Sequence, residues 1–304
     1  MLITSTQRLI QFSKIAILTD LEGDSEKVLD YAGSMARWYG SKLMLLHACP
    51  GEKHVHIPPE SRRNLLRAGA TVKDDAKDKL RALIDRKNLQ SMVTGMAVFG
   101  DGIELLLEEL DKYQPDLLLL ATHGREGIRK WLAGSIAEEV FRGAEWPVLL
   151  LGPEFSQTET VPQRQFSRIL YATDLSAASL RALQYAAGIA HDHEARLTVL
   201  YVEPDSGKGY TFDRVMAQQR LEDWLREHMA GLPAAMEGAR RIVEFGVLET
   251  KIVEAAAQGR ADLLVVGARG MGGAAGLASH FMSGTAYEVV CSAACPVLVV
   301  PQAR

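Results

Sequence analysis

The feature of this sequence that most constrains its fold is an internal repeat. One domain accounts for both halves of the chain, because three blocks recur in the same order. The matching blocks are 14–50 with 168–204, 97–124 with 243–270, and 134–151 with 284–300. A chain of 304 residues is long enough for two domains of ordinary size.

The spacing between matching positions locates two differences in length. Asp20 and Asp174 are 154 positions apart, whereas the offset is 146 between the glycines at 124 and 270 and 150 between those at 134 and 284. The second copy is therefore shorter in its middle, and its glycine-rich loop is four residues longer. We expect domains at 1–152 and 166–304, joined by a linker at 153–165 that is polar and contains proline.

Each copy alternates short apolar runs with longer amphipathic ones. In the first copy the short runs are "KIAIL", "KLMLLH", "MAVF", "DLLLLA" and "PVLLL", and between the first two of them apolar residues recur at helical spacing. Continuous apolar runs are typical of parallel strands that are covered on both faces. The alternation predicts an α/β fold, with two tandem doubly wound, Rossmann-like domains whose ligands bind at the carboxyl ends of the strands.

Composition excludes several classes of protein. The net charge of -4 lacks the excess of positive charge that is typical of nucleic-acid-binding proteins. No run approaches 18 apolar residues, so we expect no membrane span, and the first residues lack the pattern of a signal peptide. Three cysteines make no disulfide framework, which indicates a cytoplasmic protein.

Polar residues and glycines gather where the strands are expected to end. The first strand of each copy ends in Thr-Asp, at Thr19-Asp20 and Thr173-Asp174, and each glycine loop ends in Gly134-Ser135 or Gly284-Thr285 before a predicted helix. A helix start preceded by glycines exposes backbone N–H groups, which favour phosphate. Tight turns and ordinary helix caps produce the same pattern, so both interpretations stay open for either copy alone.

The order and spacing of these pieces resemble the universal stress protein family (UspA-like), and in particular its tandem two-domain members. The resemblance covers nearly the whole chain and rests on the strand-Thr-Asp opening, the Gly-x2-Gly-x9-Gly-(Ser/Thr) loop and the closing "PVL" strand. It implies a five-stranded parallel sheet in each domain, and pairing of the two domains through their last strands as an internal pseudo-dimer. One branch of the family binds ATP at the loop, and another binds no nucleotide.

The resemblance also implies the site residues. In the first copy they are Thr19, Asp20, Ala48, Ala121, His123, Gly124, Gly134, Ser135 and Ile136; in the second they are Thr173, Asp174, Val202, Gly267, Gly270, Gly284 and Thr285. Each copy departs from the pattern once. Ala121 replaces the first glycine, and thirteen residues instead of nine separate Gly270 from Gly284. The spacing favours the first copy as the ATP site, while the glycines favour the second.

Other motifs are weaker. No Gly-x4-Gly-Lys-(Ser/Thr) occurs, and "GMGGAA" lies too late in its domain for a dinucleotide site. The pairs His54/His56 and His191/His193 are interpreted as solvated loop histidines rather than metal ligands. Cys291 and Cys295, four apart, are interpreted as buried residues of the last helix.

The resemblance implies a cytoplasmic stress-response regulator that binds ATP, with Mg as an optional companion ion, and that is not a dedicated enzyme. His123 has no serine nucleophile or paired carboxylate that would make it catalytic. A slow ATPase or nucleotide-dependent transferase is one alternative, and a nucleotide-free interaction scaffold is another. A protein partner and a homodimer of the tandem chain stay open.

Overall fold

The chain, described here from a computed structural model, forms two compact units. The described residues are 8–19, 21, 25–48, 74–99, 103–121, 145–156, 166–203, 210–267 and 285–302. The N-terminal unit consists of Phe12–Gly143 with Glu159–Gln163, and the C-terminal unit consists of Met1–Gln11, Ala144–Thr158 and Arg164–Arg304. The last strand of the first repeat thus belongs to the same unit as the second repeat.

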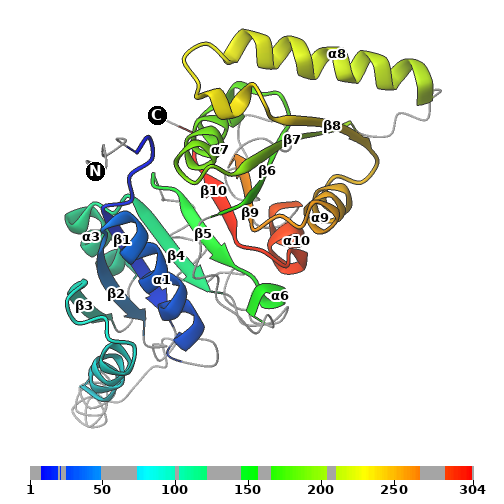
Figure 1. The fold of residues 1–304 in the computed structure, drawn as a ribbon. Helices are drawn as coiled ribbons and strands as arrows, with labels where there is room; N and C mark the ends of the chain where they lie inside the picture. Colours follow the sequence, from blue (N-terminus) through cyan, green and yellow to red (C-terminus); the bar gives the residue numbers. More distant parts are fainter. Residues whose placement is uncertain are drawn as a thin grey trace. The chain divides into compact units, whose positions relative to one another are not determined.

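The N-terminal unit contains a parallel sheet with the strand order β3-β2-β1-β4. Its elements are β1 (Lys14–Thr19), α1 (Ser25–Tyr39), β2 (Lys42–Ala48), a helix at 74–86, β3 (Val93–Phe99), α3 (Ile103–Tyr113) and β4 (Leu117–Ala121) (Figure 1). Strand β1 is central, because Ile15 is in register with Leu43 on one side and with Leu117 on the other. The apolar runs of β1, β2 and β4 are buried, as expected of strands covered on both faces, whereas the run of β3 at the edge of the sheet is only partly buried.

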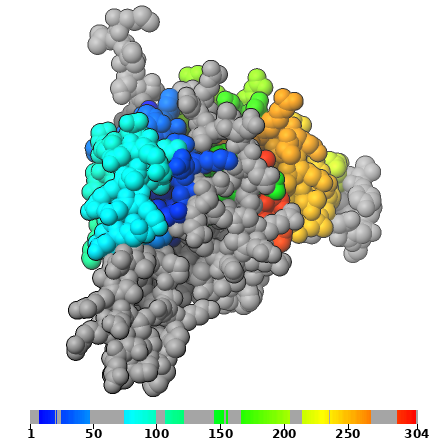
Figure 2. Space-filling model, turned by 90° about the horizontal axis from the view of Figure 1, so that it is seen from below, coloured from blue at the N-terminus to red at the C-terminus, as the bar shows by residue number. Residues whose placement is uncertain are grey.

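The helix at 74–86 carries one apolar face and one charged face. Ala76, Leu80 and Leu83 are buried, whereas the acidic and basic residues between them are exposed. Beyond its end, Lys87 Nζ lies 2.8 Å from Asp30 Oδ2 and 3.2 Å from Glu26 Oε2 on α1. Residues 74–99, in cyan in Figure 2, form part of the surface.

The C-terminal unit has the strand order β5-β10-β9-β6-β7-β8. Its strands are β5 (Val148–Leu151), β6 (Arg168–Thr173), β7 (Arg196–Glu203), β8 (Arg240–Phe245), β9 (Leu263–Gly267) and β10 (Val297–Val300); its helices are α6 (Pro153–Ser156), α7 (Leu180–Asp192), α8 (Tyr210–His228), α9 (Leu248–Gly259) and α10 (Thr285–Ser292), with short 3-10 turns at Ala177–Ser179 and Ala234–Met236. Helices α7 and α8 lie on one face of the sheet and α9 and α10 on the other (Figure 1), as right-handed crossovers require.

The final strands of the two repeats pair with each other inside this unit. Strand β10 runs antiparallel to β5, with Val297 opposite Leu150 and Val299 opposite Val148. This is the contact expected from the resemblance, and it covers a strand edge that would otherwise be free to aggregate. The predicted linker begins with structure, because Pro153–Ser156 forms one helical turn and Phe155 is buried.

Close packing holds this junction. An added Cβ at Gly152, between β5 and α6, would lie 2.1 Å from the backbone carbonyl oxygen of Val290 on α10. Since no real Cβ approaches an oxygen so closely, glycine is required where β5 and α6 meet α10.

Two interpretations of the sequence were wrong in detail. His193 is not solvated: it is 6% exposed, its Nδ1 accepts the N–H of Phe166 at 3.2 Å, and burial lowers its pKa to about 4. Cys291 and Cys295 are both buried as expected, but α10 ends at Ser292, so Cys295 follows the helix. Burial raises the pKa of the Cys295 thiol to about 12.

Candidate functional site

The carboxyl ends of β6, β7 and β9 bring four of the predicted site residues to one edge of the C-terminal sheet. Thr173 ends β6 and is in register with Tyr201 of β7, immediately before Val202. On the other side of β6, Ala172 is in register with Val266, immediately before Gly267. In a doubly wound sheet this edge, next to the central strand, is where ligands bind (Figure 1).

A chain of hydrogen bonds fixes the turn that follows β6. The Leu175 N–H donates to Thr173 Oγ1 at 3.0 Å, and Thr173 Oγ1 lies 3.0 Å from Ser179 Oγ. Ser179 Oγ donates its one hydrogen to the carbonyl of Ser176 at 2.7 Å. Thr173 must therefore be the donor to Ser179, and the bonds run in one direction and reinforce one another.

This turn holds Leu175 in an unusual backbone conformation. Leu175 has a φ of +62°, a region that residues other than glycine rarely adopt. Leu21, at the matching position of the first repeat, has a φ of +63°. Strained backbone of this kind persists only where the surroundings hold it, and it gathers at functional sites.

The turn leaves two oxygen atoms without a hydrogen-bond partner among the described residues. Asp174 Oδ1 accepts the Ser176 N–H at 3.0 Å, while Asp174 Oδ2 has no partner among the described residues. Ser176 Oγ is buried and likewise lacks a hydrogen-bond partner within the described part of the chain. Because buried polar groups are nearly always paired, an unpaired hydroxyl beside a free carboxylate oxygen suits a ligand that carries hydroxyl groups.

The first repeat forms the same turn. Thr19 Oγ1 donates to Ser25 Oγ at 2.9 Å and accepts the Leu21 N–H at 3.2 Å. The Thr19 carbonyl lies 2.8 Å from Nδ1 of His47, a buried histidine of β2. Thr19 and Thr173 are thus both positioning residues for the turn, and their hydroxyls are already engaged within the protein.

An acidic side chain follows Val202 at the end of β7. Glu203 Oε2 accepts the Tyr201 hydroxyl and lies 2.7 Å from Arg220 Nη2 of α8. Burial and the neighbouring Glu203 carboxylate raise the pKa of Tyr201 to about 12, so the phenol stays protonated at neutral pH. Arg220 neutralises Glu203, which removes one source of repulsion toward an anionic ligand at this edge.

Gly267 has a structural reason to be glycine. An added Cβ would lie 3.2 Å from Ser179 Cα and 3.5 Å from the carbonyl oxygen of Ala178. The end of β9 therefore packs directly against the 3-10 turn that opens α7, which makes Gly267 a packing residue as well as a candidate ligand contact.

Three more predicted residues are described by their backbone alone. Ala48 is the last residue of β2, Ala121 the last of β4, and Thr285 the first of α10. The remaining predicted residues lie outside the described residues: Asp20, His123, Gly124, Gly134, Ser135, Ile136, Gly270 and Gly284.

Sequence reasoning missed the serines of this edge. Ser25 and Ser179 complete the two turns, and they are 154 positions apart, the same offset as Asp20 and Asp174. This shared offset marks the two serines as matching positions of the repeats and could have identified them, although serine before a helix normally indicates only a helix cap. Ser176 carried no such signal, since the residue at the matching position of the first repeat is Glu22.

The described residues form neither a metal-binding cluster nor a membrane-spanning helix. Within the described ranges, no three His, Cys, Asp or Glu side chains converge where a metal ion could bind. None of the helices in those ranges has the length and apolar character that a membrane span needs.

Comparison with known proteins gives a consistent result. The model of the Universal stress protein family matches the chain twice, over residues 11–152 and 165–301. A Thermus aquaticus protein named "Universal stress protein in QAH/OAS sulfhydrylase 3'region" is 34% identical over 140 residues, which are 44% of this chain and 98% of that protein. The crystal structure of a universal stress protein from Archaeoglobus fulgidus matches with a TM-score of 0.65 and 20% identity, over 96% of this chain and 97% of that one. A universal stress protein solved in complex with cAMP is similar to 45% of this chain and 97% of its own, with 24% identity and a TM-score of 0.36.

Proposed function

This chain belongs to the universal stress protein family, and from that premise we propose that it is a cytoplasmic stress-response regulator that binds ATP at the carboxyl edge of at least one repeat. The observation that carries the proposal is the turn after β6. Asp174 Oδ2 and the buried Ser176 Oγ are both without partners among the described residues, and both belong to the short segment that directly follows the strand end.

The residues present fit the parts of a nucleotide. The Asp174 carboxylate can accept hydrogen bonds from ribose hydroxyls, as acidic residues at this edge do in doubly wound folds. The end of β7 at Val202 offers backbone groups to a base. The N-terminus of α10, which begins at Thr285, offers backbone N–H groups to phosphate, and the phosphates carry negative charge that the helix dipole favours.

Regulation explains these residues better than catalysis. A dedicated hydrolase needs a general base positioned against the attacking water. Among the described residues of this edge, Glu203 is already bound by Tyr201 and Arg220, and in the proposed site the unpaired oxygen of Asp174 binds the ribose hydroxyls, away from the phosphates. A ligand that binds one state of the chain better than another shifts the chain toward that state without any chemistry.

The test begins with the freshly purified full-length chain. The protein is denatured and the released small molecules are separated by anion exchange, and we expect ATP at one or two equivalents. ADP in place of ATP would favour a slow ATPase. No nucleotide, combined with no calorimetric signal for added ATP, with or without Mg, or for cAMP, would refute nucleotide binding and favour the scaffold alternative.

Variants then assign the site to a repeat. Asp174→Ala is expected to lower ATP affinity if the second repeat is occupied, and Gly134→Val to do so if the first is. Asp223→Ala is the matched control, because Asp223 is an exposed carboxylate of α8 that pairs with Arg226. Unchanged ATP stoichiometry in Asp174→Ala would exclude the second repeat, and unchanged affinity in Gly134→Val would exclude the first.

A further inference from the structure

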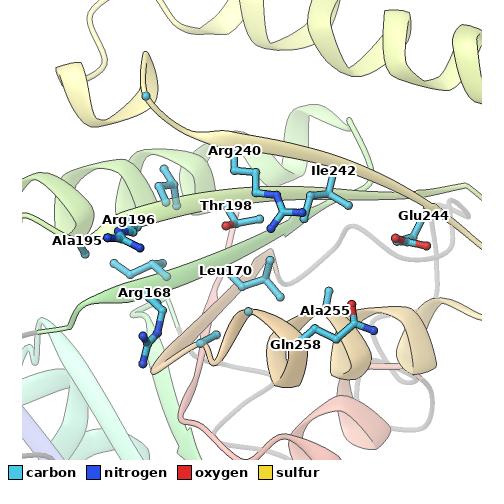
Figure 3. Close-up of a pocket in the computed structure, with 15 residues that line it drawn as sticks. Arg168, Leu170, Ala195, Arg196, Thr198, Arg240, Ile242, Glu244, Ala255 and Gln258 are labelled. Carbon is cyan, nitrogen blue, oxygen red and sulfur yellow. The ribbon is translucent and has the colours of Figure 1, made fainter.

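A cavity lies between α9 and the strands β6, β7 and β8 of the C-terminal sheet. Its volume is about 570 Å³, within the range of small-molecule pockets. Arg168, Arg196 and Arg240, which line it, are the first residues of β6, β7 and β8, whereas Thr173 and Val202 lie near the far ends of the strands. The cavity extends along β8 as far as Glu244, which is in register with Val202, and the three arginines lie at its other end (Figure 3).

Strand register gathers the three arginines on one face. Arg168 is in register with Arg196, and Arg240 is in register with Thr198, which is two residues after Arg196 and so points to the same side. Neighbouring strands are about 4.8 Å apart, so Arg168 and Arg196 start from adjacent backbone positions. In the view of Figure 3, Thr198 lies between the guanidinium groups of Arg196 and Arg240. Like charges directly opposite in a sheet are destabilising, and a bound anion would relieve the repulsion.

No acidic side chain of the described residues forms an ion pair with these arginines. Arg168 donates its Nε–H to the Arg260 carbonyl at 2.7 Å, which fixes one guanidinium at the rim of the cavity. Glu244 is the acidic residue in the lining, and it lies four residues after Arg240 along β8 (Figure 3). The local charge is therefore positive in a chain whose net charge is -4.

The rest of the lining is suited to an organic molecule rather than a bare ion. Leu170 and Ile242 of the sheet and Ala255 of α9 provide apolar surface, while Thr198 and Gln258 provide a hydroxyl and an amide (Figure 3). Thr198 and Ile242 are only partly covered, so this face of β7 and β8 is accessible beyond α9. Guanidinium groups bind phosphate oxygens in bidentate fashion, which favours phosphate over a simple halide.

We infer that this cavity binds a small phosphate ester, with the phosphate held by Arg196 and Arg240 and the organic group on the surface of Leu170, Ile242 and Ala255. Arg168 supplies further positive charge at the rim. The inference stands independently of ATP binding at the other edge, because the two sites share no residue.

Phenyl phosphate is the probe, titrated into the full-length chain and followed by calorimetry. We expect it to bind more tightly than inorganic phosphate, because the phenyl group covers apolar surface, and more tightly than benzoate, which carries one negative charge. We expect the double variant Arg196→Gln/Arg240→Gln to bind at least about tenfold more weakly, which corresponds to about 1.4 kcal/mol. Arg226→Gln is the matched control, since Arg226 is an exposed arginine of α8.

Each outcome decides the proposal. Absence of phenyl phosphate binding at millimolar concentration would overturn it, as would equal binding by the double variant and wild type. Benzoate binding as tightly as phenyl phosphate would refute recognition of phosphate. If the double variant fails to fold, the single Arg240→Gln variant gives the same comparison. Retained phenyl phosphate binding in Asp174→Ala would separate this cavity from the proposed nucleotide site.

Discussion

Replacing Thr173 by valine tests the hydrogen-bond chain that fixes the turn after β6. Valine keeps the shape of threonine but removes the oxygen that accepts the Leu175 N–H and donates to Ser179. The part-buried Leu175 amide then has no acceptor, while Leu175 must still adopt its φ of +62°. The turn should open more often in this variant than in the wild type.

The expected cost follows from the bonds lost. Two net hydrogen bonds are worth about 1–3 kcal/mol, and an unpaired buried donor adds to this. The extra methyl group of valine recovers up to about 0.8 kcal/mol through burial. We therefore expect Thr173→Val to lower the free energy of unfolding of the C-terminal unit by about 1–2 kcal/mol. Thr173→Ser is the matched control, because it keeps the hydroxyl and loses only the methyl group.

Amide hydrogen exchange at Leu175 measures this directly, and urea unfolding gives the overall stability. A change of about 1–2 kcal/mol corresponds to about 5- to 30-fold faster exchange at Leu175 if opening is local. The serine control is expected to keep wild-type protection at this amide. Equal exchange rates in the valine and serine variants would refute the hydrogen-bond chain as the element that holds the turn.

Three further predictions concern the C-terminal unit. Gly152→Ala should lower the free energy of unfolding by about 3 kcal/mol in urea titrations because its Cβ has no room. Gly259→Ala, where nothing lies within 4 Å, should leave it equal or higher, and equal effects would contradict the packing argument. Burial lowers the pKa of His193 to about 4 from 6.5, so the neutral ring stabilises the fold above pH 6.5, and that contribution is lost as the pH falls toward 4. His193→Gln should flatten this part of the pH profile of unfolding by up to about 3 kcal/mol, and an unchanged slope would exclude His193 as its source. Because burial raises the pKa of Cys295 to about 12, alkylation followed by mass spectrometry should modify it only after denaturation, and labelling in the native chain would contradict its burial.

The fold was predictable because the same pattern of strand and helix segments occurs in both repeats. Apolar runs such as those of β1 and β6 are buried as expected, and the final strands pair with each other. The wrong predictions concern single residues, His193 and Cys295, whose surroundings depend on local details of the structure. His193 directly follows α7 in a polar stretch, and it is buried in contact with Phe166, which is distant in sequence. Helix α10 ends before Cys295, although four-residue spacing suggested a continuous helix.

For the candidate site, the sequence predicted which strand ends carry polar residues but not how those residues are hydrogen-bonded. Thr-Asp at the end of a strand indicated which edge carries polar groups, and the turn geometry confirms that Thr173 and Asp174 lie there. The sequence could not show that the Thr173 hydroxyl is hydrogen-bonded within the turn. Nor could it show that the Ser176 hydroxyl is buried without a hydrogen-bond partner among the described residues. Those facts depend on the left-handed conformation of Leu175, which composition and periodicity do not encode.

Gly267 shows why the glycines of such a site are difficult to interpret from sequence. A glycine at a strand end is expected wherever a ligand approaches the backbone, and the same missing Cβ is required here because Ser179 Cα would lie 3.2 Å away. In the second repeat Gly267 is therefore suited to two roles, packing against the turn at Ser179 and contact with a ligand. The fold alone requires the first role. In the first repeat the matching position is Ala121, and the residue matching Ser179 is Ser25. The alanine shows that the position does not demand glycine in every copy of the domain, so glycine there is weak evidence for a ligand. The buried Ser176 Oγ is the stronger evidence, because nothing in the packing of the described residues accounts for leaving it unpaired.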